Sequence, residues 1–189
     1  MGQAIERIET RRLILRHFAR EDWRDLQEIA ISKEQDDFSA CDFAWPTDEE
    51  GVRAACAYFA ADAAAWAVAL KETGKVICFI RQNGIEAGQE MDIGHIVNRE
   101  YAGQGYEEEA LCALYRWVFS EMGVKAILAR WAAADEEKLA PLKALGMRCV
   151  SVHMGDYFQP NAKGLTGQFA GATYRITKEE FAQRYGLRK

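Results

Sequence analysis

The residues between positions 92 and 111 have the types and the spacing that could bind a phosphate group. An apolar stretch over 92–98 leads into a glycine pair, Gly103 and Gly105, and a strongly periodic helical pattern begins immediately afterwards. Glycines leave backbone N–H groups unshielded, and the macrodipole of a helix adds positive potential at its N-terminus. A strand, a glycine loop and a helix in this order therefore predict an anion site at the start of the helix.

The elements that must position this loop can be read from hydrophobic periodicity and turn signals. Strands are expected at 12–16, 66–70, 76–81, 91–98, 126–131, 149–154 and 172–176. Helices are expected around Trp23–Ala30, after Thr47, from the glycine loop to Gly123, before Gly146 and after Thr177. This order predicts a mixed sheet covered by helices.

Three local signals refine these boundaries. Thr47 and Thr177 each stand three residues before a glutamate, which is the spacing of a capping box. Asn83 and Gly84 predict a loop before the strand at 91–98. Pro141 lies in the short helix expected before Gly146. A proline lacks an N–H and is tolerated only in the first turn of a helix, so this helix is expected to begin shortly before Pro141.

Length and composition limit the class of protein. The chain has 189 residues, of which 49% are hydrophobic and 28% charged, without a repeat or linker, so we expect one domain over residues 1–189. No apolar run approaches the roughly 20 residues that span a bilayer, and the N-terminus has no apolar signal core. We therefore expect a cytoplasmic protein without a membrane partner.

Charge and the metal-binding residue types narrow the partners further. A net charge of −5 argues against nucleic acid and slightly favours a cationic amine as substrate. The basic residues Arg11, Arg12 and Arg16 lie in a strand pattern and are expected on a solvated face. The five cysteines are odd in number and widely spaced, which predicts mostly buried free thiols, and no histidine has metal-ligand spacing, so we expect no metal.

At the glycine loop the chain resembles the GNAT superfamily of acyl-CoA-dependent N-acetyltransferases, within it most closely the group that includes ribosomal-protein N-terminal acetyltransferases. The stretch Glu100-Tyr101-Ala102-Gly103-Gln104-Gly105 is similar to the superfamily's loop, Q/R-x-x-G-x-G/A. Before it, Asp92-Ile93-Gly94-His95 is similar to the group's E-I-G-Y. The stretches Thr10–Arg16, Leu145–Met147 and Thr177–Phe181 also look like segments of that group, so the resemblance covers roughly residues 10–182.

The resemblance implies an α/β (α+β) fold with a mixed central sheet of six to seven strands and four or five flanking helices. Acetyl-CoA would lie in a cleft where the fourth and fifth strands splay apart. Backbone groups of Ile96 and Val97 would pair with pantetheine. Backbone amides of Gly103, Gln104, Gly105 and Tyr106 would hold the pyrophosphate, and Asp135 stands where the family uses an asparagine that helps to hold the cofactor.

The implied reaction is direct transfer of an acetyl group to a primary amine, on a protein N-terminus or a small molecule, by a monomer or a homodimer. Asp92 and His95 are candidate general bases, and alternation along the strand puts them on opposite faces, so at most one faces the cleft. Histidine has the unperturbed pKa, about 6.5, that suits proton transfer near neutral pH. Trp45, Tyr101 and Tyr157 are candidates for the acceptor pocket.

Several residues depart from the family's pattern. Glu100 opens the loop in place of glutamine or arginine, and Glu107 and Glu108 replace small residues in the first helical turn. We expect both of the latter glutamates to point to solvent; inward-pointing carboxylates would weaken acetyl-CoA binding. Lys138 replaces the family's serine and is expected to be exposed. No tyrosine, serine or threonine lies between Trp131 and Val150, so no general acid is assigned.

These departures keep an alternative open: a degenerate member of the fold that binds acyl-CoA or a partner without catalysis. A Rossmann-type dinucleotide site fits poorly, because its third glycine position is occupied by Glu108.

Overall fold

A computed structural model describes residues 7–160 and 167–187 of the chain. The strands are β1 (Arg7–Glu9), β2 (Leu13–Arg16), β3 (Ala65–Leu70), β4 (Val76–Glu86), β5 (Glu90–Val97), β6 (Ala126–Ala132), β7 (Arg148–Asp156) and β8 (Gln168–Thr177). The helices are α1 (Trp23–Glu34), α2 (Glu49–Ala61), α3 (Tyr106–Glu121), α4 (Glu136–Ala144) and α5 (Lys178–Tyr185).

The eight strands form one mixed sheet in the order β1-β2-β3-β4-β5-β6-β8-β7. Every neighbouring pair is antiparallel except β5 and β6, which run parallel. The α/β fold and the expected element order are confirmed. The sheet has eight strands rather than six or seven, because the three-residue β1 pairs with β2 at the edge.

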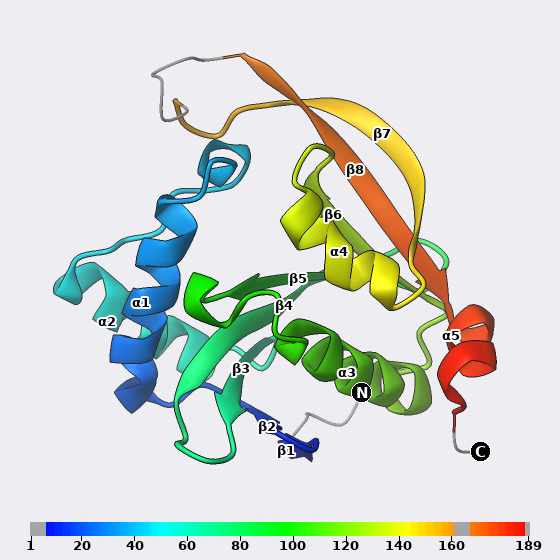
Figure 1. Ribbon diagram of the computed structural model, residues 1–189, viewed down its shortest axis with the longest axis horizontal. Helices are drawn as coiled ribbons and strands as arrows, with labels where there is room; N and C mark the ends of the chain where they lie inside the picture. Colours follow the sequence, from blue (N-terminus) through cyan, green and yellow to red (C-terminus); the bar gives the residue numbers. More distant parts are fainter. Residues whose placement is uncertain (1–6, 161–166, 188–189) are drawn as a thin grey trace.

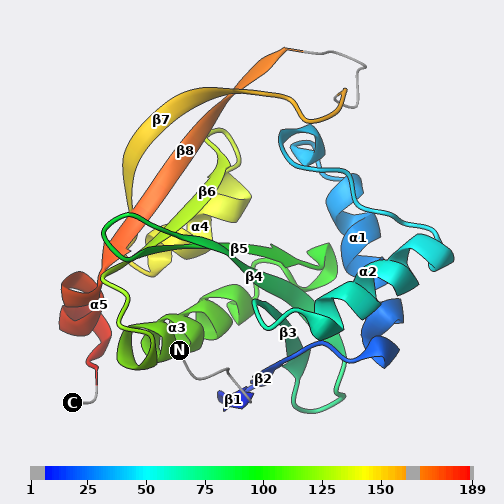
Figure 2. The ribbon, with the colours of Figure 1, turned by 180° about the vertical axis from the view of Figure 1, so that it is seen from behind.

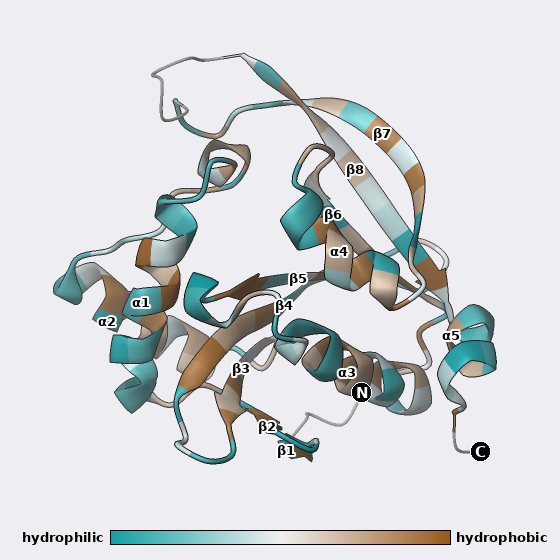
Figure 3. Ribbon diagram, in the orientation of Figure 1, coloured by the Kyte–Doolittle hydropathy of each residue, from teal (hydrophilic) through white to brown (hydrophobic). Residues whose placement is uncertain are grey.

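Helices cover both faces of the sheet, as Figures 1 and 2 show from opposite sides. On one face, Leu26 of α1 and Cys56 of α2 pack against the alanines of β3 and Phe79 of β4. On the other face, the apolar stripe of α3 packs against β2, β4 and β5 together with residues of α4 and α5. In Figure 3 the hydrophobic colour covers much of β3, β4 and β5, the strands between these two layers.

The structure corrects three local predictions. The cap of α2 is Asp48 rather than Thr47, because its carboxylate accepts a hydrogen bond from the Gly51 N–H at 2.9 Å. Asn83 and Gly84 form no loop; β4 continues through them with an irregular register, so that the turn comes after Glu86. Pro141 is the sixth residue of α4 rather than a first-turn residue, because the helix already begins at Glu136.

Three further expectations concern a helix cap, the cysteines and membrane-spanning segments. Thr177 and Glu180 form the predicted capping box of α5. All five cysteines are free, but only Cys56 and Cys78 are buried, whereas Cys149 is exposed. Within the described ranges, no helix has both the length and the hydropathy needed to cross a bilayer.

Candidate active site

A gap between β5 and β6 opens the sheet next to the glycine loop. The two strands pair only from Glu90 to Asp92, opposite Ala126–Leu128. Beyond that point β5 continues to Val97, paired on its other side with β4, while β6 pairs with β8. On the side toward β6, the backbone of Ile96 and Val97 therefore borders a splayed cleft rather than a paired strand.

The glycine loop lies between the end of β5 and the first turn of α3. Gly103 and Gly105 have φ angles of +69° and +75°, a region that L side chains rarely adopt. A Cβ added at Gly103 would meet nothing within 4 Å, so the loop surface is open at that point. Glycine here supplies both the turn and room for a ligand at the backbone.

The start of α3 presents free hydrogen-bond donors. The first bond of the helix runs from the Glu109 N–H to the Gly105 carbonyl, at 3.2 Å. The N–H groups of Tyr106, Glu107 and Glu108 precede it, and none of them donates to a group in the part of the chain that the structure describes. Together with the helix dipole, these donors form a site that fits a phosphate.

Arg12, immediately before β2, braces this loop, a role that its sequence pattern did not predict. Its guanidinium donates to the Gln104 carbonyl at 3.1 Å, pairs with Glu109 at 2.6 Å and lies 4.1 Å from the centre of the Tyr106 ring. The Glu109 carboxylate also accepts hydrogen bonds from the Thr10 hydroxyl and the Arg12 N–H. Arg11 is exposed, as expected for a solvated face, whereas Arg16 is only partly exposed and pairs with the buried Asp22 at 2.7 Å.

Glu107 does not point to solvent, in contrast to the expectation for the first helical turn. It is 6% exposed, and its Oε1 lies 3.3 Å from the Nε2 of His95, which is 1% exposed. Neither nitrogen of His95 nor this carboxylate oxygen has a hydrogen-bond partner of good geometry in the described residues. Glu108 is partly exposed.

His95 borders the splayed cleft on the α3 side of the sheet. Its ring stands edge-on to the Trp131 ring of β6, with centroids 5.5 Å apart. The fully buried Cys78 also lies in this region, and burial followed by the charge of Glu107 raises the pKa of its thiol. Because the Cys78 thiol is neutral, His95 and Glu107 are the polar pair beneath the loop.

Asp92 lies on the opposite face of β5 from His95, as alternation predicts. It belongs to the face of Ile96, which packs with the α1 and α2 layer, whereas Met91, Ile93 and Val97 pack with α3. Its carboxylate pairs with Arg130 and accepts a hydrogen bond from Asn83 at 3.3 Å. Burial raises the pKa of Asp92, against the opposing effect of Arg130.

Asp135 and Lys138 stand at the start of α4. Asp135 is buried and caps the helix by accepting from the Lys138 N–H at 3.1 Å, and burial raises the pKa of its carboxyl. The Lys138 side chain is only 12% exposed and lies 3.3 Å from the Asp36 carboxylate. The expectation of an exposed Lys138 is therefore wrong: it borders a small cavity together with Ile96 and Val97.

A large cavity of about 570 Å³ opens on the α1–α2 side of the cleft. Asp92, His95 and Ile96 contribute to it from β5. Its aromatic wall includes Phe43, Trp45, Phe59, Phe79, Trp131 and Phe158. Of the three aromatic residues expected at an acceptor pocket, only Trp45 lines it; Tyr101 lies against Tyr106 and Tyr157 stacks on Phe169.

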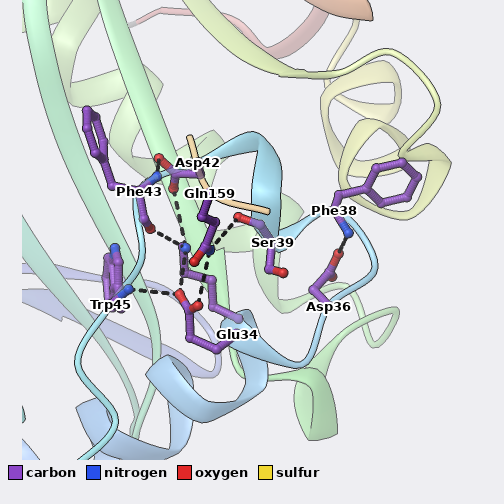
Figure 4. A network of polar contacts seen from close by, with 9 residues as sticks. Glu34, Asp36, Phe38, Ser39, Asp42, Phe43, Trp45 and Gln159 are labelled. Atoms are coloured by element: carbon purple, nitrogen blue, oxygen red, sulfur yellow. Dashed lines mark hydrogen bonds and ion pairs between the residues drawn. The ribbon is translucent and has the colours of Figure 1, made fainter. Parts of the chain in front are cut away.

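A polar network holds the wall that follows α1 (Figure 4). The buried Lys33 donates to the Phe43 carbonyl at 2.6 Å and to Glu34 at 2.9 Å. Glu34 in turn accepts from the Trp45 N–H at 2.8 Å and from the Gln159 amide at 3.3 Å. The segment that carries Phe43 and Trp45 is therefore tied both to α1 and to the chain that follows β7.

Comparison with known proteins identifies related sequences and folds. Residues 12–148 match the family described as an acetyltransferase (GNAT) domain. A comparison with curated proteins finds no match.

Solved structures share the fold at low sequence identity. A GNAT-family acetyltransferase from Bacillus anthracis has a TM-score of 0.74 and 22% identity, covering 92% of this chain and 99% of that one. A ribosomal-protein-S5-alanine acetyltransferase from Vibrio fischeri has a TM-score of 0.72 and 14% identity, with coverage of 93% and 98%. Mycobacterium smegmatis RimJ in complex with CoA-disulfide has a TM-score of 0.68 and 16% identity, with coverage of 89% and 83%.

Proposed function

Because this chain belongs to the GNAT acetyltransferase family, we propose that it transfers the acetyl group of acetyl-CoA to a primary amine. The observation that carries this proposal is that three features follow one another in the chain. They are the edge of β5 that is unpaired toward β6, the open loop at Gly103 and the unpartnered N–H groups at the start of α3. Acetyl-CoA supplies an activated thioester.

In this proposal the loop binds the pyrophosphate and β5 binds pantetheine. Backbone amides of Gly103, Gln104, Gly105 and Tyr106 contact the pyrophosphate, and Arg12 adds positive charge beside them. Backbone groups of Ile96 and Val97 pair with the pantetheine arm and polarise the thioester carbonyl. Asp135 fixes the start of α4 on the other side of the same cleft.

The amine enters from the large cavity and meets the thioester near Ile96, which borders both cavities. The nitrogen forms a bond to the acetyl carbon, and the carbon–sulfur bond breaks to release CoA as a thiolate, which takes up a proton from water. The proton of the attacking amine passes to the proposed general base. Holding both reactants in place accounts for much of the acceleration.

His95 is the proposed general base, and Glu107 is its positioning residue. The carboxylate of Glu107 lies beside Nε2, which leaves Nδ1 as the acceptor for the amine proton, directly or through water. Asp92 fits this role less well: it lies four residues from Ile96, about 13 Å along a strand, and it is paired with Arg130.

The alternative is a protein that binds acyl-CoA without transferring the group. The buried carboxylate of Glu107 in the first turn of α3 favours this alternative, because it puts negative charge close to the pyrophosphate site.

The two functions are separated by measuring CoA thiol release from acetyl-CoA with a panel of primary amines, with detection of the acetylated product by mass spectrometry. Amine-dependent thiol release and an N-acetylated product are expected. Tight binding of acetyl-CoA without amine-dependent release across the panel would establish the non-catalytic alternative instead.

A further inference from the structure

The large cavity beside Ile96 has an aromatic wall that the general acetyl-transfer reaction does not require. Trp45 stands edge-on to Phe79 with ring centroids 5.0 Å apart, and Phe59 lies 4.7 Å from the same ring. Trp131 lines both this cavity and the small one that is bordered by Val97. A cavity of about 570 Å³ is within the range of roughly 300–1,000 Å³ that accommodates a drug-sized ligand.

The mouth of the cavity leaves large apolar side chains in contact with solvent. Phe43 is 67% exposed and Phe158 is 52% exposed, and their rings lie 4.5 Å apart. They come from two segments that are distant in sequence and joined by the Phe158 N–H, which donates to the Ala40 carbonyl at 2.9 Å. An exposed aromatic pair on a fixed backbone is informative, because it costs solubility unless a ligand uses it.

The charged side chains of the wall have partners elsewhere in the protein. Arg81 pairs with Asp62 at 3.0 Å, and Arg130 pairs with Glu86 and Asp92. Asp42 lies 3.9 Å from the buried Lys33. The two acidic and two basic side chains are each paired within the protein. The cavity therefore has no strong electrostatic potential that would attract a polycation or a carboxylate.

We propose that the acceptor is a primary amine carrying an aromatic group, with its ring packed against the wall formed by Trp45, Phe59 and Phe79 and its nitrogen near Ile96. This inference rests on the acetyltransferase function proposed above. The same chemistry is presented by a small arylalkylamine and by a peptide that begins with an aromatic residue. The exposed position of Phe43 and Phe158 leaves space outside the mouth for either.

The test compares acceptors at saturating acetyl-CoA. 2-Phenylethylamine is compared with ethanolamine and spermidine, and a tetrapeptide beginning with phenylalanine is compared with the same peptide beginning with serine. We expect kcat/KM to be at least tenfold higher for the aromatic member of each pair, since apolar contacts of this size discriminate roughly 10–200-fold. The pair that gives the larger kcat/KM identifies the source of the amine.

Variants connect that preference to the cavity. Trp45→Ala removes a partly exposed wall residue and is expected to reduce the aromatic preference at least fivefold; Phe43→Ala, at the mouth, provides a second variant if the first does not fold. Tyr58→Ala is the matched control, because this exposed aromatic residue of α2 lies next to Phe59 but is not a lining residue. A preference for ethanolamine, spermidine or the serine peptide, or an equal preference in Trp45→Ala and wild type, would overturn the inference.

A binding measurement keeps this inference separate from the proposed reaction. Calorimetric titration of 2-phenylethylamine and ethanolamine into the protein with CoA bound requires no turnover. Binding of the aromatic amine alone, weakened by Trp45→Ala, would support the aromatic site even if no amine releases CoA. Equal or absent binding of both amines would overturn it even if acetyl transfer occurs with other acceptors.

Discussion

The Nε2 atom of His95 and the Oε1 atom of Glu107 lie 3.3 Å apart beneath the glycine loop, and both side chains are buried. His95 belongs to the strand that borders the cleft, and Glu107 belongs to the first turn of the helix that presents the phosphate-binding N–H groups. This contact links the proposed base to the proposed cofactor site.

The variant Glu107→Gln is expected to change catalysis and binding in opposite directions. Loss of the carboxylate removes the group that orients His95, so kcat should fall about tenfold or more, within the range for general base catalysis. The same change removes a negative charge near the pyrophosphate, which at about 8 Å corresponds to roughly 0.5–2 kcal/mol, so acetyl-CoA should bind more tightly.

A purely structural role for Glu107 would weaken both properties together, so the split between kcat and the acetyl-CoA Kd is diagnostic. Glu108→Gln is the matched control on the same helical turn; its kcat should remain at the wild-type value. An unchanged kcat in Glu107→Gln would remove Glu107 from the mechanism.

Alanine variants of two glycines that flank α3, Gly103 and Gly123, distinguish the loss of a ligand contact from the cost of backbone strain. Gly103 and Gly123 have φ angles of +69° and +65°, and a Cβ at either position would meet no atom within 4 Å. Alanine should therefore cost about 1–2 kcal/mol of stability at each. Only Gly103→Ala should also raise the acetyl-CoA Kd, by about tenfold, because its methyl group would stand on the phosphate surface; thermal unfolding and calorimetry measure the two effects. Equal Kd values in the two variants would argue against a phosphate at this loop.

Arg12 should be required for tight binding of acetyl-CoA. Its guanidinium holds the Gln104 carbonyl and Glu109, so Arg12→Gln should raise the Kd about fivefold or more and reduce its dependence on salt. Arg11→Gln is the control, since Arg11 is exposed and has no ion pair within the described residues. Similar Kd values and salt dependence for both variants would mean that Arg12 acts only in folding.

The carboxylate of Glu109 should make stability depend on pH. Burial raises its pKa, but hydrogen bonds from Thr10, the Arg12 backbone and the Arg12 guanidinium outweigh this effect, so the pKa is below its ordinary value. A lowered folded-state pKa stabilises the protein above the unfolded-state pKa of about 4.3, and this contribution is lost as the pH falls through the folded-state value.

The Tm difference between wild type and Glu109→Gln should therefore be largest near neutral pH and shrink below about pH 4. Thermal unfolding monitored by circular dichroism across this range gives the comparison. A difference that stays constant down to acid pH would show that shape, rather than charge, explains the role of Glu109.

Local sequence signals predicted the elements that build the cleft. The apolar stripe of α3, its stop at Gly123 and the capping box at Thr177 depend on residues within a few positions of one another. The same signals failed where tertiary contacts prevailed. Asn83 and Gly84 have the composition of a loop, but pairing with β5 extends the strand through them.

The inward direction of Glu107 could not be read from its helix, because a glutamate in a first turn is normally solvated. Its partner, His95, lies twelve positions earlier on a different element, and their contact depends on how α3 packs across β5. The contacts of Arg12 were not predictable for the same reason, because its partners Gln104 and Glu109 lie more than 90 residues away in the sequence.

The most direct test of the account compares acetyl-CoA with acetylpantetheine in calorimetric titrations of the wild-type protein. The two ligands share the thioester and the pantetheine arm, but only acetyl-CoA carries the pyrophosphate that the loop from Gly103 to Tyr106 is proposed to hold. We predict micromolar binding of acetyl-CoA and at least a hundredfold weaker binding of acetylpantetheine. Equal affinities, or no binding of acetyl-CoA, would contradict the account.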